Sequence, residues 1–258
     1  AFQTTPPSRF NSGFVAKIST PRSATTVDGA AYTGDSLAAE SIVSSFGTNL
    51  ALSTLSANSV PLPTTLAGTT VKVNDSSGTE RAAQLFFVSP TQVNFQIPPG
   101  TANGAAMITI ANSDGGISLS QVQIVNVKPS LFSADTTGRG LAAAHAQRGG
   151  SLTFEPVVKF DFTKGQWVAL PIDLGAASEQ VYLILYGTGL RLRSSLSQVT
   201  ATIGGTPATV SYAGAQPDFV GLDQVNMLIP RSLIGRGAVD VALNVEGKTT
   251  NTVKVNIK

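Results

Sequence analysis

Hydrophobic and polar residues alternate in short runs along most of the chain, which is the pattern of half-buried β-strands. Turns rich in Gly, Asn, Asp and Pro separate these runs. The clearest runs cover 70–73, 106–110, 118–127, 199–203, 224–229 and 252–257. One run, 181–186, is apolar throughout and predicts a strand that is buried on both faces. The pattern therefore predicts an all-β protein with little helix.

An eight-residue stretch occurs twice and divides the chain. Thr91-Gln-Val-Asn-Phe-Gln-Ile-Pro98 and Asp223-Gln-Val-Asn-Met-Leu-Ile-Pro230 share the core Gln-Val-Asn-x-x-Ile-Pro. A Gly-Thr-x-Leu turn lies upstream of each copy, at Gly47–Leu50 and at Gly187–Leu190. Such a repeat indicates duplicated structural units. Because several short, regularly spaced strands accompany each copy, we predict two tandem immunoglobulin-like β-sandwiches.

We place the first sandwich at 36–128 and the second at 129–258, with an additional β-hairpin region at 141–173. Residues 1–35 show no steady period and contain several Pro and Gly, so we interpret them as an extended N-terminal arm. The alternative is a disordered leader.

Within this arm, Phe14, Ala16 and Ile18 share one face of a short alternating run. We predict that this face is inserted as a strand at an exposed sheet edge, either of the same chain or of a neighbouring subunit. Insertion into a neighbour would join subunits head-to-tail and produce filaments.

Composition narrows the classes of function. Charged residues make up 12% of the chain, and the net charge of +2 is scattered, so we expect no nucleic-acid partner. The absence of Cys excludes disulfides and thiolate sites. No apolar run approaches the ~20 residues that span a bilayer. Since the chain starts at Ala1 without a leader, we expect a processed product or a piece of a longer precursor.

Candidate catalytic and metal-binding residues are few. His145 is the only histidine, and a catalytic triad would have to combine it with Ser151 or Asp161, but there is no Gly-x-Ser-x-Gly motif. The turns at 74–80 and 112–116 carry oxygen ligands suited to calcium. We prefer to interpret them as β-turns, which favour the same residues. The sequence thus predicts no enzyme, no cofactor and no metal site.

Polar residues recur inside the repeat. Gln92 and Asn94 point to the same face of their strand. We expect such a side-chain amide to bind neighbouring backbone at a corner of the sandwich.

Four aromatic residues suit a sugar-stacking platform: Trp167, Tyr182, Tyr186 and Tyr212. Tyr182 and Tyr186 share one strand face, and we expect them to pack in the core instead.

Several phrases together resemble a known family. They are Pro61-Leu-Pro-Thr-Thr-Leu-Ala-Gly68, Phe87-Val-Ser-Pro-Thr-Gln-Val-Asn-Phe-Gln-Ile-Pro98, Pro171-Ile-Asp-Leu174, Leu183-Ile-Leu-Tyr-Gly-Thr-Gly189, and Tyr212-Ala-Gly with Gly221-Leu-Asp-Gln-Val-Asn226. Over about 36–258 the chain resembles the extracellular C-terminal domain family of acidobacteria, often called the Solibacter-type C-terminal domain. Its Gly-Thr-x-Leu turns also resemble the IPT/TIG branch of immunoglobulin-like domains, and its first eighteen residues resemble the end of a bacterial β-propeller repeat.

The resemblance implies a secreted or cell-surface protein, commonly placed after propeller repeats, and it assigns no catalytic residues. We predict a non-enzymatic structural or adhesive protein that assembles into extracellular filaments through Phe14, Ala16 and Ile18. The alternative is a carbohydrate- or surface-binding accessory module of a larger β-propeller protein, which would need an exposed row of aromatic side chains.

Overall fold

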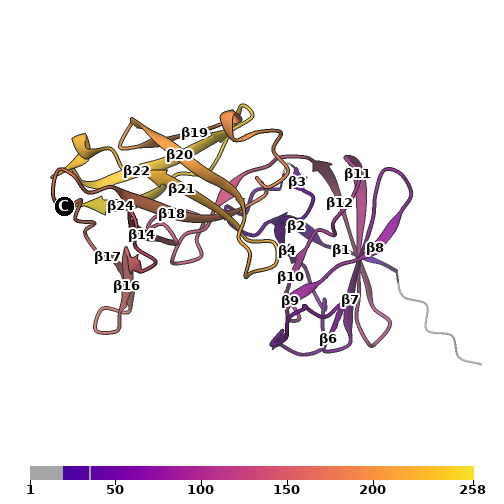
Figure 1. Cartoon of the computed structure of the whole chain (residues 1–258). Coiled ribbons are helices and arrows are strands. Elements are labelled where there is room, and N and C mark those ends of the chain that lie inside the picture. The colour runs from indigo at the N-terminus through magenta and orange to yellow at the C-terminus, as the bar shows by residue number, and fades with distance from the viewer. Residues whose placement is uncertain (1–19, 35) are drawn as a thin grey trace, which may run out of the picture.

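The computed structural model describes residues 20–34 and 36–258, and within them the chain forms two β-sandwiches that lie side by side (Figure 1). Among these residues there is no α-helix; two short 3-10 helices, η1 (Leu196–Gln198) and η2 (Arg231–Leu233), connect strands. One buried hydrophobic cluster spans residues 24–124 and the other residues 127–257. The predicted all-β sandwich fold is confirmed.

The first sandwich consists of two sheets packed around side chains such as Leu85, Phe95 and Ile108. In the described residues, the seven-stranded sheet has the order β1-β12-β11-β7-β6, with β3 also beside β12 and β8 beside β7. The five-stranded sheet has the order β2-β4-β10-β9-β5. The strand bounds are β1 Arg22–Ser23, β2 Thr25–Asp28, β3 Leu37–Ala38, β4 Ile42–Phe46, β5 Leu55–Ser56, β6 Thr65–Leu66, β7 Thr69–Asn74, β8 Glu80–Ala82, β9 Leu85–Val88, β10 Gln92–Gln96, β11 Gly104–Ala111 and β12 Ile117–Val125.

The second sandwich is built from one sheet that folds over its own core. Within the described part of the chain this sheet has ten strands, ordered β15-β14-β18-β21-β20-β19-β22-β23, with β13 beside β18 and β24 beside β22. The long strand β20 pairs with β19 near its start and with β21 over 209–215, so it passes from one layer to the other. Two further strands, β16 and β17, form a separate hairpin that projects from the sandwich (Figure 1). The strand bounds are β13 Ser130–Leu131, β14 Ala144–Arg148, β15 Phe154–Pro156, β16 Val158–Asp161, β17 Gln166–Ala169, β18 Val181–Thr188, β19 Val199–Ile203, β20 Thr206–Ala215, β21 Asp223–Leu228, β22 Gly237–Val245, β23 Lys248–Thr249 and β24 Val253–Ile257.

The segment 22–28, which the sequence assigned to the N-terminal arm, belongs to the first sandwich instead. β1 pairs in parallel with β12, and β2 pairs in antiparallel with β4. Ala24 and Val27 are buried, and Thr26 Oγ1 lies 2.7 Å from Ser45 Oγ in the interior. Because the hydroxyl of Thr26 is hydrogen-bonded, this polar residue can be buried. The segment therefore packs in the core although its hydrophobic alternation is weak. The predicted arm boundary at residue 35 is therefore wrong.

Three residues carry the predicted strand donation: Phe14, Ala16 and Ile18. They lie outside the described residues, so insertion into another subunit stays a prediction.

Direct contacts join the two sandwiches. Thr188 Oγ1 accepts a hydrogen bond of 2.8 Å from the backbone N–H of Ile42 and donates one of 3.1 Å to the carbonyl of Gly221. Gly221 has φ +71°, and a Cβ there would lie 2.7 Å from Ile42 Cγ1. Only glycine combines that backbone conformation with such a close approach. In addition, Arg191 of the second sandwich lies 3.6 Å from the carboxylate of Glu40 in the first.

No helix within the described residues has the length and apolarity to cross a membrane.

Candidate functional site

Aromatic side chains gather on the outer face of the second sandwich. Along β18, Leu183 and Leu185 point into the core, so Tyr182 and Tyr186 point outward and are only half-buried. The expectation that these two tyrosines pack in the core is therefore wrong. The prediction failed because Ile184, on the outward face, is apolar as well, and the sequence alone did not say which face the core would take.

The β16–β17 hairpin adds further aromatic side chains beside this face. Phe160 lies opposite Trp167 in the strand register, with ring centroids 5.6 Å apart and nearly perpendicular planes. Phe162 packs against Phe160 at 5.1 Å, although it remains 89% exposed. Asp161 closes the hairpin by accepting hydrogen bonds from the backbone N–H and hydroxyl of Thr163. The hairpin thus holds three large rings at the surface, a costly arrangement for side chains without a ligand.

Trp167 lines two hollows. One has a volume of about 340 Å³ and is lined by His145, Pro156, Val158 and Tyr186 as well as by Trp167. The other has a volume of about 370 Å³ and is lined by Asp135, Gly140, Leu141, Phe160, Gly165 and Gln166 together with Trp167. Trp167 is 39% exposed, so a ligand in either hollow can contact the indole ring. Concavities of this size, lined by apolar rings and a few polar groups, are candidate binding sites.

His145 lines the first hollow. Its ring stands edge-on to Tyr186 and to Phe154, with centroid separations of 5.8 Å in both cases. Its Nδ1 lies 3.3 Å from the hydroxyl of Tyr186. Burial lowers the pKa of His145 and raises that of Tyr186, so both are neutral at neutral pH. The first hollow therefore presents an uncharged surface.

The residues proposed as catalytic partners of His145 serve other purposes. Asp161 caps the hairpin turn, as described above, and the backbone carbonyl of Ser151 accepts a hydrogen bond from Gln147. The structure brings His145 together with aromatic rings rather than with a hydroxyl nucleophile and a carboxylate.

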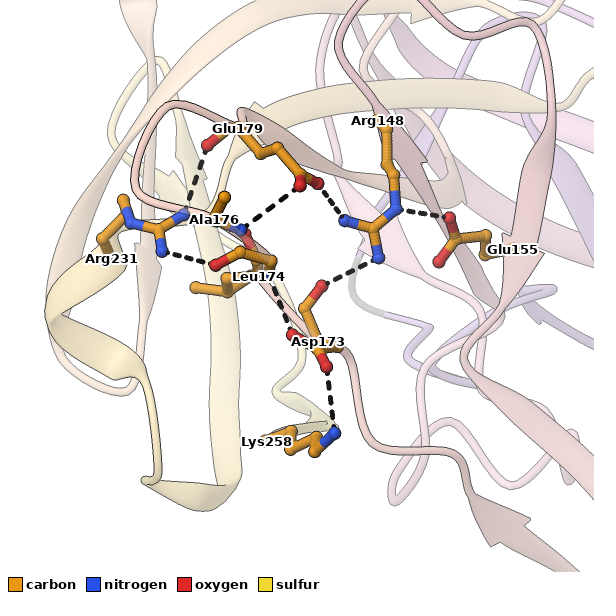
Figure 2. Close-up of polar contacts among 9 residues, drawn as sticks. Arg148, Glu155, Asp173, Leu174, Ala176, Glu179, Arg231 and Lys258 are labelled. Atoms are coloured by element: carbon orange, nitrogen blue, oxygen red, sulfur yellow. Dashed lines mark hydrogen bonds and ion pairs between the residues drawn. The ribbon is translucent and has the colours of Figure 1, made fainter.

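An ion-pair network holds the strand that carries His145 (Figure 2). Arg148, three residues further along β14, donates from Nε to Glu155 at 2.9 Å and from Nη1 to Glu179 at 2.6 Å. Its Nη2 also donates to the backbone carbonyl of Asp173 at 3.2 Å. Glu155 follows Phe154 in β15. The ion pair between Arg148 and Glu155 therefore also holds the strand that carries Phe154, whose ring contacts His145.

The loop 173–180 is held from its other side as well (Figure 2). Arg231 donates to the carbonyls of Leu174 and Gly175, each at 2.8 Å, and Lys258 Nζ lies 3.0 Å from Asp173. Hydrogen bonding to the Gly175 N–H and the Lys258 ammonium lowers the pKa of Asp173. The charged side chains of this network pair with one another, so we assign the network a structural role.

The polar residues of the repeat bind each other. In β10, Gln92 Nε2 donates to Asn94 Oδ1 at 2.8 Å, and in β21 Gln224 Nε2 donates to Asn226 Oδ1 at the same distance. All four side chains lie on outer sheet faces and are half-buried. The expectation that these amides hold neighbouring backbone is thus corrected. Within the repeat that contact is made by Gln96, which donates to the carbonyl of Glu40.

The two turns considered for calcium are closed by hydrogen bonds. The carboxylate of Asp75 accepts from the backbone N–H groups of Ser77, Thr79 and Ala102. Asn112 Oδ1 similarly accepts from the N–H of Gly116 at 2.8 Å. In the part of the chain that the structure describes, no three His, Asp or Glu residues are arranged to hold a metal ion.

Sequence reasoning singled out Trp167 and the tyrosines but missed three phenylalanines of the same surface: Phe154, Phe160 and Phe162. The available signal was their density, since four large rings fall within 154–167 and flank turn residues. Apolar rings beside a tight turn are seldom all buried, because a two-stranded hairpin has no second layer to cover them.

Similarity to known proteins is found only at the level of solved structures. No family model and no curated protein matches the chain. Among solved structures the chain is similar to SGBP-B of the Bacteroides ovatus mixed-linkage glucan utilization locus, solved in complex with a mixed-linkage heptasaccharide. The sequence identity is 13% and the TM-score 0.34, and the match covers 86% of this chain but 43% of that chain. This chain thus spans less than half the length of SGBP-B, and a likeness of this size says nothing about its ligand.

Proposed function

We propose that this protein is a non-enzymatic binding module that holds a neutral glycan against the aromatic surface of its second sandwich. The observation behind the proposal is the exposure of Trp167, a partly exposed indole that lines two shallow hollows. Tyr186 lines the first hollow together with Trp167, and Phe160 lines the second.

Aromatic rings at a surface suit sugars for a physical reason. One face of a pyranose ring carries mainly C–H groups, and these pack against the negative face of an aromatic ring. The hydroxyls at the ring edge stay free to bind polar groups or water. Trp167 offers the largest ring for such stacking, and Gln166 and Asp135 lie at the second hollow to bind hydroxyls.

The charge of the surface favours a neutral ligand over an acidic one. The lining of the 340 Å³ hollow contains no Lys or Arg, and His145 is uncharged at neutral pH. In the 370 Å³ hollow the only ionised side chain is Asp135. Burial raises its pKa, but hydrogen bonds from Ser133 and Thr137 outweigh that effect and lower it overall. An anionic polymer would meet a carboxylate here and no cation.

In this proposal the chain acts at the cell surface or outside the cell, as part of a longer protein of the acidobacterial family that its sequence resembles. Glycan retention by such a module would serve adhesion. The filament hypothesis depends on residues 14–18 and receives no support from the described part of the chain.

The proposal is tested by binding of the full chain to insoluble neutral polysaccharides, namely cellulose, chitin, mannan and xylan. The informative variant is Trp167→Ala, with Ile117→Ala as the matched control. Ile117 is almost equally exposed (38% against 39%) but lies on β12 of the first sandwich. We expect Trp167→Ala to lose at least about tenfold in affinity, as is typical of a central aromatic anchor.

Trp167→Phe distinguishes loss of stacking from loss of folding. It keeps an aromatic face, so it should retain part of the binding that the alanine variant loses. Failure of the unaltered chain to bind any of the polysaccharides would refute the proposed function.

A further inference from the structure

Both halves of the repeat present the same pattern of side chains on an outer sheet face. In the second sandwich, Tyr186 lies opposite Gln224, and Asn226 lies opposite Tyr212. Since Gln224 binds Asn226, the order across β18, β21 and β20 is aromatic, amide pair, aromatic. We call this set the second ladder.

The first sandwich repeats this order strand by strand. Phe46 of β4 lies opposite Gln92 of β10, and Asn94 of β10 lies opposite Phe87 of β9. Gln92 binds Asn94 at 2.8 Å, as in the other copy. We call Phe46, Gln92, Asn94 and Phe87 the first ladder. Directly opposed side chains on neighbouring strands lie close enough to interact.

The equivalence extends to the sequence around each ladder. Phe46 directly precedes the turn Gly47–Leu50, and Tyr186 directly precedes the turn Gly187–Leu190. Both are partly accessible, with Phe46 37% exposed and Tyr186 half-buried. Each sandwich thus carries an aromatic ring at the same point of an outer sheet face.

We propose that the first ladder is a second binding site for the same class of ligand, a neutral polysaccharide, so that one glycan chain contacts both sandwiches. This inference rests on the proposed function. Each ladder combines two aromatic rings with a pair of amides and contains no charged side chain. Within the described residues the amide groups of Gln92 and Asn94 bind each other through one N–H only, which leaves the remaining donors and Gln92 Oε1 for hydroxyls.

The two ladders lie near the contact between the sandwiches that Ile42, Gln96 and Gly221 form, and we call this contact the joint. At the end of the first ladder's face, Ile42 and Gln96 lie against Gly221, where a Cβ would be 2.7 and 3.5 Å from their side chains. Gly221 in turn lies two residues before β21, the strand that carries Gln224 and Asn226. In Figure 1 the sheet containing β4, β10 and β9 forms the side of the first sandwich nearer the second. A chain that leaves one ladder near the joint therefore meets the other.

Two linked sites raise the affinity for a long polymer without changing the affinity of either site for a short ligand. The second contact becomes intramolecular once the first is made, and such linkage can add a factor of about 10² or more. The affinity for the polymer therefore depends on both sites, whereas the affinity for a short oligosaccharide depends on a single site.

The test measures both ligands with the full chain and the double variant Phe46→Ala/Gln92→Ala. The probes are a soluble neutral polysaccharide built from the same sugar as the insoluble polymer that the unaltered chain binds, and the tetrasaccharide of that sugar. We expect the double variant to lose at least about tenfold in affinity for the polymer. Its affinity for the tetrasaccharide at the second sandwich, followed through the fluorescence of Trp167, should stay within about twofold. Gln92→Ala alone provides a milder variant should the double variant unfold, and Ile117→Ala is the control.

The outcomes separate this inference from the proposed function. If the double variant binds the polymer as tightly as the unaltered chain while Trp167→Ala does not, the second site is refuted and the proposed function stands. If the double variant weakens tetrasaccharide and polymer binding equally, its effect is a general one and the inference fails. If the unaltered chain binds no polysaccharide, both fail together.

Discussion

The Nε of Arg191 donates a hydrogen bond of 2.7 Å to Asp223, a carboxylate with no exposed surface. Asp223 also accepts from the N–H of Leu190 at 2.8 Å. Burial raises the pKa of Asp223, and the guanidinium opposes this shift. Asp223 is the first residue of the second repeat copy, where the first copy has Thr91. The pair thus fixes the start of β21 beside the joint.

Removal of the arginine should destabilise the protein strongly. Arg191→Ala leaves the carboxylate of Asp223 buried without its cation, and such a loss typically costs about 3–5 kcal/mol. Urea unfolding measures this cost. Glu40→Gln, which removes only the longer contact of 3.6 Å, should cost less than about 1 kcal/mol. Equal effects of the two variants would contradict the account of the joint.

Acid stability should depend on Asp75. The N–H of Ala102, the hydroxyl of Ser77 and the guanidinium of Arg81 hold the pKa of Asp75 well below its ordinary value. The folded state therefore keeps this group ionised when the unfolded chain, with a pKa of about 3.9, is already protonated. That contribution is present above the unfolded pKa and is lost as the pH falls towards the folded one.

Asp75→Asn should therefore lower stability at pH 7 and flatten the loss of stability in acid. Urea midpoints between pH 7 and pH 2 check both effects. An unchanged acid profile would show that Asp75 does not close its turn in this way.

Stability near pH 6 should depend on the single histidine. Burial lowers the pKa of His145 in the folded state, so below the ordinary value of about 6.5 the unfolded chain takes up a proton more readily. Stability is therefore complete above that value and falls as the pH drops through it. We expect a decrease in the melting temperature between pH 7.5 and 5.5 that His145→Gln removes. Identical slopes in the two proteins would contradict the burial of His145 against Tyr186.

Filament formation is tested by deleting only part of the N-terminal arm that the sequence predicted at residues 1–35. Because 22–28 form β1 and β2, removal of residues 1–35 would damage the first sandwich itself. Removal of 1–19 keeps both strands and removes Phe14, Ala16 and Ile18. If these residues insert into a neighbour, filaments seen by electron microscopy of the full chain disappear in the truncated one, and unchanged filaments would end this hypothesis.

The alternation of residues predicted most strands, and the repeat indicated two units, because burial of one sheet face leaves a clear period in the sequence. The alternation did not predict the strands in which polar side chains are buried. The segment 22–28 enters the core with Thr26 and Asp28 buried, and Asp28 is satisfied by backbone N–H groups of Ala30, Ala31 and Thr33. Such hydrogen bonds allow burial without leaving a hydrophobic pattern.

The aromatic surface was only partly predictable for a different reason. The sequence places Tyr182 and Tyr186 on one face of β18, and the structure agrees. Which face meets the core depends on the opposite layer, because Leu183 and Leu185 share one buried cluster with side chains of β22 such as Val241. His145, Trp167 and Tyr186 come from three different strands and line the same hollow. No local sequence pattern predicts that these strands bring the three side chains together.

Binding of a glycan against Trp167 can be followed directly by fluorescence, because Trp167 is the only tryptophan of the chain. Its fluorescence should be recorded while soluble neutral oligosaccharides are added to the unaltered protein. Stacking of a sugar removes water from a half-exposed indole, so we expect a saturable shift of the emission to shorter wavelength. An emission spectrum that stays unchanged while an oligosaccharide demonstrably binds would place the ligand elsewhere and contradict the proposed site.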